Sequence, residues 1–184
     1  IYRRFPETVC DQKYPCFDLL LNTLQPWVDG ESLNDHRLRE AGMELVHYTC
    51  MVSPLNAREL VRSDGVTKLF ALLCDCLVRF ERLRTVLQSM EDSNMTRTRA
   101  SVEGNPHRVE IASIIKLLAF VLKALSVVCN FESGRNKLLV DGSAFALAIV
   151  DICKYVKDMP LAVEAALEII AHCAVSTELQ DLFI

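Results

Sequence analysis

Two stretches of the chain share one plan: residues 48–65, YTCMVSPLNARELVRSDG, and residues 127–142, VVCNFESGRNKLLVDG. Each passes a cysteine, turns a corner, continues through a short segment of helical spacing and ends in an Asp-Gly pair. Glycine is favoured where a helix ends in a left-handed turn. The shared plan therefore predicts a long helix, a tight corner, a short helix, a glycine break and a third helix, in two successive copies.

A third copy of this plan follows at a spacing of 44 residues, where Leu125, Cys129, Ser133, Leu138 and Leu139 recur as Ile169, Cys173, Thr177, Leu182 and Phe183. A period in the forties with two or three helices per unit is typical of armadillo and HEAT repeats. We therefore predict an all-α chain, arranged as an armadillo/HEAT-like right-handed helical solenoid. A generic helical bundle is the alternative, although it does not account for the recurring Asp-Gly pairs.

The predicted solenoid is a single domain over residues 1–184, with approximate units at 16–81, 107–157 and 160–184. Apolar residues at helical spacing predict helices over 16–28, 34–52, 54–63, 66–81, 107–129, 132–140, 143–157, 160–174 and 176–184. The polar segment at about 84–106 is predicted to be a loop, which would explain the longer first repeat of 77 residues between Asp-Gly pairs. We expect the chain to be a segment of a longer protein.

The composition excludes several classes of protein. Hydrophobic residues make up 51% and charged residues 24% of 184, so the bulk of the chain is expected to fold. Six glycines and six prolines are too few for a turn-rich all-β protein. The net charge of −4 disfavours a nucleic-acid partner. Most of the eight cysteines lie in apolar runs, as expected of buried thiols in the reducing cytoplasm.

Residues 111–128 form the one stretch long and apolar enough to require a membrane check. Lys116 and Lys123 interrupt it, and their spacing of seven places both lysines on one helical face. We predict a helix that is buried on most sides, with a narrow wet stripe and no insertion into a membrane.

No catalytic residue, cofactor or metal ion is predicted, and we expect the protein not to be an enzyme. His47 and Cys50 lie three residues apart, so they are the best Cys-His candidate, although such a pair is more often helix packing. Cys74 and Cys76 are two apart on a predicted helix, where they point to different faces and make a poor metal pair.

The candidate partner-binding residues lie on the third helices, 66–81 and 143–157, because the third helix of an armadillo unit lines its concave surface. The residues of this predicted groove are Lys68, Asp75, Arg79, Asp151, Lys154 and Asp158. Their mixed signs argue against a simple anion site, and a solvated face is the alternative for each of them. At the C-terminus, Leu179, Leu182, Phe183 and Ile184 predict an exposed apolar end that self-associates.

The segment VSPLNARELVRSDGVTKLFALLCDCLVRF, residues 52–80, resembles a corner in the large endosomal DnaJ-domain proteins of receptor-mediated endocytosis. The matching positions are Ser53, Pro54, Asn56, Ala57, Glu59, Leu60, Gly65 and Cys76, and Phe131-Glu132-x-x-Arg135 is similar to a corner in the family's next repeat. The resemblance implies a scaffold on the cytosolic face of endosomes, with sorting nexins and the actin-nucleating WASH machinery as partners. The chain lacks the His-Pro-Asp tripeptide of a J domain, so chaperone-stimulating activity does not carry over.

These observations predict a non-catalytic protein-interaction scaffold, part of an endosomal co-chaperone that acts in membrane trafficking and receptor sorting. Two alternatives remain open. One is a purely structural spacer in a long solenoid, and the other is an unrelated cytosolic armadillo-repeat adaptor.

Overall fold

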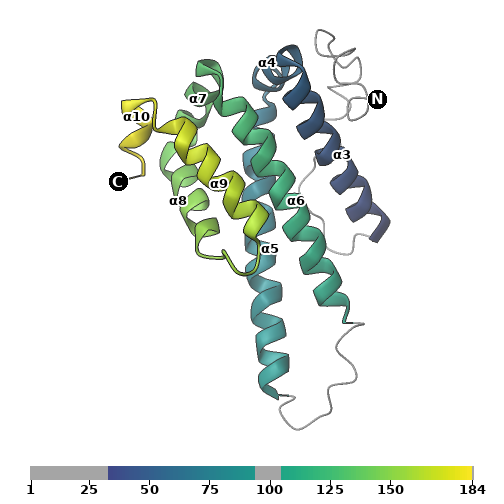
Figure 1. The fold of residues 1–184 in the computed structure, drawn as a ribbon. Helices are drawn as coiled ribbons and strands as arrows, with labels where there is room; N and C mark the ends of the chain where they lie inside the picture. The colour runs from purple at the N-terminus through teal and green to yellow at the C-terminus, as the bar shows by residue number, and fades with distance from the viewer. Residues whose placement is uncertain (1–32, 94–104, 184) are drawn as a thin grey trace.

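The computed structural model describes residues 33–93 and 105–183, and within these ranges every regular element is a helix (Figure 1). The elements are α3 (Leu33–Val52), α4 (Pro54–Arg62), α5 (Gly65–Ser93), α6 (Pro106–Cys129), α7 (Glu132–Leu138), the 3-10 turn η2 (Leu139–Asp141), α8 (Gly142–Cys153), α9 (Pro160–Cys173) and α10 (Thr177–Gln180). The prediction of an all-α fold is confirmed for these residues. The predicted helix at 16–28 lies outside them.

Helices of like position lie side by side. The long helices α3, α6 and α9 form one layer with α6 in the middle, and α5 and α8 pack behind them (Figure 1). The short helices α4, α7 and α10 lie at the same end of the molecule, where each follows a long helix. The order of elements is therefore long, short, long in the first two units and long, short in the third.

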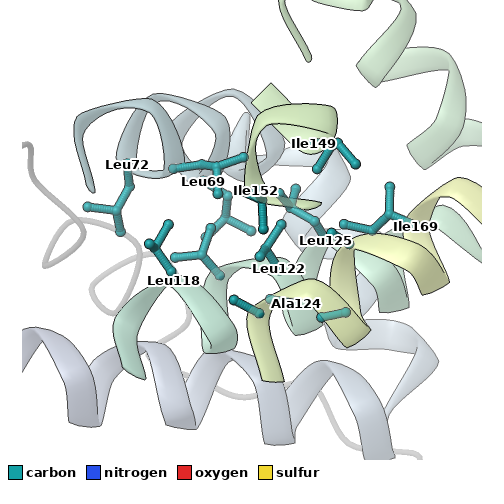
Figure 2. Close-up of a cluster of buried hydrophobic side chains, with 14 of the residues drawn as sticks. Leu69, Leu72, Leu118, Leu122, Ala124, Leu125, Ile149, Ile152 and Ile169 are labelled. Atoms are coloured by element: carbon teal, nitrogen blue, oxygen red, sulfur yellow. The ribbon is translucent and has the colours of Figure 1, made fainter. Parts of the chain in front are cut away.

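Helix α6 is the centre of the core because α3, α5 and α9 all pack against it. Its buried leucines contact apolar side chains from both layers, and Figure 2 shows this cluster, which includes Leu69, Leu72, Leu118, Leu122, Leu125, Ile149, Ile152 and Ile169. Within the described ranges α6 alone passes a length and hydropathy test for a membrane span, and 56% of its most apolar window is buried inside the protein. Burial by three neighbours explains why a core helix is apolar nearly all round.

The corner between α3 and α4 depends on two polar residues. Ser53 has extended backbone and precedes Pro54, whose fixed φ suits the first turn of a helix. The Thr49 carbonyl oxygen, near the C-terminal end of α3, accepts the Ser53 N–H at 3.0 Å and the side-chain amide of the buried Asn56 at 3.3 Å. The corner is thus closed by hydrogen bonds.

At the Asp-Gly pair between α4 and α5, it is Asp64 and not glycine that adopts the left-handed conformation, with φ of 60°. Gly65 is needed for close packing instead. A Cβ atom at this position would lie 2.3 Å from Leu60 Cδ1 and 2.7 Å from the Leu60 carbonyl oxygen. The break therefore requires both residues, each for a different reason.

Three predicted helix ends are wrong. The last helix, predicted to reach 184, ends at Gln180. Helix α5 does not end at 81 but continues to Ser93, because Leu83 and Leu87 extend its apolar side beyond Phe80 at helical spacing. The predicted loop therefore begins at least ten residues later than about 84, and residues 94–104 lie outside the described part. Helix α8 ends at Cys153 rather than 157, and a run of turns follows it.

The apolar residues near the C-terminus are not the exposed surface that their position predicts. Leu179 is fully buried, and Leu182 and Phe183 are half-buried against the core. Leu182 lies over Gly142, where the missing side chain leaves room for it. Ile184 lies outside the described residues. The side chains of Leu179, Leu182 and Phe183 pack at least partly within the chain, and self-association stays a prediction.

Candidate functional site

The predicted groove residues lie on α5 and at the end of α8, and they take part in interactions within the chain. Arg79 pairs with Glu110 of α6, with 2.6 Å between Nη2 and Oε1, so it joins two helices of the core. Lys68 and Asp75 are half-buried on α5, and each has side-chain interactions of its own. These three residues remain on α5 as predicted, but Arg79 serves the contact between α5 and α6.

The other three predicted residues lie at the end of α8. Asp151 is in the last turn of the helix and pairs with Lys154 directly after it. Asp158 is in the following turn and pairs with Arg84 of α5, at 3.4 Å. Lys154 and Asp158 are therefore turn residues and not part of a helical stripe. All three residues form ion pairs within the chain, and the groove itself stays a prediction.

A cluster around Tyr155, which the sequence reasoning missed, joins α5 to the turn after α8. The Tyr155 hydroxyl donates to Glu81, at 2.8 Å, and its ring packs edge-on against Phe80, with centroids 5.2 Å apart. The Arg84 guanidinium lies 5.1 Å from the centre of the Tyr155 ring, a cation–π geometry. Burial and the bond to Glu81 raise the pKa of Tyr155. The cluster is structural, since its polar groups satisfy one another.

Two hollows lie beside α6. The larger, of 420 Å³, opens between α5 and the first half of α6, with Leu87 and Ile111 as walls and Arg84 on its rim. The smaller, of 330 Å³, lies along the open side of α6 next to the start of α9. We call the smaller one the α6 hollow. Its lining includes Lys116 and Lys123, the two lysines of the predicted wet stripe.

Burial shifts the pKa values of His47 and Cys50 away from those that nucleophilic catalysis requires. Burial raises the pKa of the Cys50 thiol to about 12, so the thiolate is absent at neutral pH. Burial, followed by the charge of Lys123, lowers the pKa of His47 to about 4. A neutral imidazole and a protonated thiol on one helix fit the interpretation that both side chains serve helix packing.

Two of the other cysteines occupy equivalent positions in successive repeats. Cys129 and Cys173, equivalent at the spacing of 44, share a hydrogen bond at the ends of α6 and α9, and this bond and burial raise the pKa of Cys129. Burial also raises the pKa of Cys76. Among residues 33–93 and 105–183, no three His, Cys, Asp or Glu side chains converge in a way that would hold a metal ion.

Fold and site together define an all-helical protein in which long and short helices alternate around one shared central helix, with polar pairs that tie helices together. The chain is 33% identical over 185 residues to a DnaJ homolog subfamily C protein of Arabidopsis thaliana, GRV2. The match covers 98% of this chain but only 6% of that relative's length. It supports a relationship to a segment of a large DnaJ-domain protein, as the corner at 52–80 predicted. No protein-family model and no solved structure matches the chain.

Proposed function

We propose that this chain is a non-catalytic protein-interaction scaffold within a co-chaperone-related protein that acts in endosomal membrane trafficking and receptor sorting. The observation that carries the proposal is the similarity of nearly the whole chain to a segment of a DnaJ homolog. Without a His-Pro-Asp tripeptide, the segment would act beside a J domain and not as one. Its location would be the cytosolic face of endosomes.

The arrangement of the helices supports a scaffold role. Like-positioned helices lie side by side in two layers, and each short helix closes the corner after a long one. In an armadillo/HEAT-like solenoid, which we propose for this chain, units stack in this way and leave long surfaces for partners. The raised pKa of the buried Cys50 thiol is consistent with a scaffold that performs no chemistry.

The experiment is a direct binding assay with the purified chain against purified sorting nexins and WASH-complex subunits, together with the location of the tagged chain in cells. Asp75→Lys combined with Lys154→Glu tests the predicted groove. Arg79 is left unchanged, because its pair with Glu110 joins α5 to α6. Glu178→Lys, exposed on α10, is the matched control. Binding that the double variant weakens would support the scaffold and the groove together.

One observation favours a second candidate, a structural spacer. Arg79, Asp151, Lys154 and Asp158, four of the six predicted groove residues, form ion pairs within the chain. The other two, Lys68 and Asp75, have interactions of their own. A face whose charges are internally paired offers less to an external protein. Failure of every endosomal protein to bind, with a diffuse distribution in cells, would contradict the scaffold and favour the spacer.

A further inference from the structure

The α6 hollow is formed by small side chains in the middle of a helical layer. Ala112 and Ala119 are seven residues apart, so they lie on one face of α6 and leave space above it. Phe120 borders this space, and Leu161 at the start of α9 forms the opposite wall. The result is a hollow of 330 Å³, large enough for an aliphatic or aromatic side chain.

The hollow is apolar although it faces solvent. Leu161 is 56% exposed, and Ala112 is exposed as well. Single exposed apolar residues are ordinary on protein surfaces, but here they border a concave space. An apolar side chain from a partner would replace water in this hollow, which is favourable.

Two lysines border the same hollow, and they differ in their pairing. The Lys116 ammonium is 2.8 Å from Glu40 of α3, so its charge is matched within the chain. Within the part of the chain that the structure describes, no carboxylate lies at ion-pair distance from the Lys123 ammonium. Lys123 is half-buried, and the nearby His47 is neutral at physiological pH because burial and Lys123 lower its pKa to about 4. A partly desolvated cation without an anion favours a carboxylate from outside.

We propose that the α6 hollow binds a peptide segment of a partner protein that inserts an aliphatic or aromatic side chain over Ala119 and pairs a carboxylate with Lys123. The inference rests on the proposed scaffold function and specifies the partner's chemistry. An acidic residue close to a large apolar residue is the recognition unit. This surface lies in the layer of α3, α6 and α9, on helices other than those of the groove predicted above.

The test uses a phage-displayed random peptide library selected on the purified chain, with enriched sequences synthesised and measured by fluorescence polarisation. Two variants address the two halves of the site. Lys123→Glu reverses the charge, and Ala119→Leu fills the hollow. We expect each to weaken binding by about tenfold or more, and Lys123→Arg to retain it. Two substitutions at exposed positions are the matched controls. Lys157→Glu, in the turn after α8, matches Lys123→Glu, and Ala144→Leu, on α8, matches Ala119→Leu.

Each outcome decides the inference. Enriched peptides that combine an acid with a large apolar residue, and that lose affinity for Lys123→Glu with helical content intact by circular dichroism, support it. Peptides that bind Lys123→Glu and Ala119→Leu as tightly as the parent chain would contradict the proposed binding site at the α6 hollow. They would leave the proposed scaffold function unaffected. A selection without binders also overturns the hollow, and the assay with endosomal proteins then decides the proposed function separately.

Discussion

At the scale of single residues, His47 shows how position changes chemistry. It lies among aromatic rings, 5.1 Å from that of Tyr48 and 6.2 Å from that of Phe120, and its buried Nδ1 has no hydrogen-bond partner. Burial and the charge of Lys123 hold its pKa at about 4. A histidine in this environment is neutral in the folded chain over the whole physiological range.

The lowered pKa of His47 predicts a loss of stability in mild acid. Between pH 6.5, the pKa of His47 in the unfolded chain, and about pH 4, its pKa in the folded chain, His47 is protonated in the unfolded chain and neutral in the folded one. Stability from the neutral imidazole is thus present above pH 6.5 and falls as the pH drops toward 4, by at most about 2 kcal/mol after allowance for partial exposure. Urea unfolding at several pH values measures it. In His47→Phe this part of the pH dependence should vanish, and its persistence would contradict the assignment.

Gly134 in α7 predicts a second residue-scale effect. A Cβ atom there would lie 2.3 Å from the Val128 carbonyl oxygen, a backbone atom that cannot move aside. We expect Gly134→Ala to cost about 2 kcal/mol of unfolding free energy, measured by urea denaturation. Gly142→Ala is the control, because its nearest contact is the flexible end of Leu182 at 2.7 Å. Equal losses in the two variants would count against packing as the cause.

At the scale of elements, the corners repeat more faithfully than the helices. In each corner a side chain of the short helix donates to a carbonyl near the end of the preceding long helix. Asn56 donates to Thr49, Arg135 to Cys129 at 2.7 Å, and Gln180 to Ala174. The last turn of a helix leaves carbonyls unsatisfied, and these donors provide partners for them. Asn, Arg and Gln perform the same role in the three corners, so a comparison of residue identities between the repeats does not reveal that these positions are equivalent.

The contribution of such a hydrogen bond to stability can be measured at the first corner, where Asn56 donates to Thr49. Asn56 is fully buried, and Asn56→Ala would remove one of the two donors to the Thr49 carbonyl, the other being the Ser53 N–H at 3.0 Å. We expect a loss of about 1–2 kcal/mol in the free energy of unfolding, measured by chemical denaturation. Asn136→Ala, at an exposed position of α7, should change it by less than about 0.5 kcal/mol. A neutral effect of Asn56→Ala would show that the Ser53 N–H is a sufficient donor for the Thr49 carbonyl.

The helices themselves follow from local periodicity, but their contacts do not. The stripe through Leu69, Leu73 and Phe80 predicts α5, while its continuation past Leu83 was obscured by the polar residues that follow. The pairing of Arg79 with Glu110 spans 31 residues and depends on how α5 lies against α6. The Tyr155 cluster depends likewise on the turn after α8. The α6 hollow requires the start of α9 beside two alanines, which no pattern along one helix reveals.

At the scale of the whole molecule, α6 holds the two layers together. The prediction that residues 107–129 form a helix buried on most sides is confirmed, and the reason is contact with α3, α5 and α9 at once. The order of long and short helices likewise follows the Cys and Asp-Gly spacing seen in the sequence. What spacing along the chain does not provide is the angle between successive units, so the solenoid remains part of the proposal.

The central place of α6 predicts the most damaging kind of substitution. Leu122 is fully buried in the cluster of Figure 2, and Leu122→Ala should cost about 3–5 kcal/mol through lost burial and the cavity left behind. Leu147→Ala, at a position on α8 that is 65% exposed, should change stability by less than about 0.5 kcal/mol. Denaturant unfolding monitored by circular dichroism measures both. A loss at Leu122 no larger than that at Leu147 would contradict the central role of α6.

The sharing of α6 has a mechanical consequence. Under tension along the chain, we expect α3 and α9 to separate before α6 unfolds, since each of these two helices packs on one side of α6. Helix α6 packs against α3, α5 and α9, so it would unfold last and in a single step. Tension along such a chain would therefore unfold the peripheral helices while the core around α6 stays folded. An extended protein of this kind could lengthen under load and then refold from that core when the load is removed.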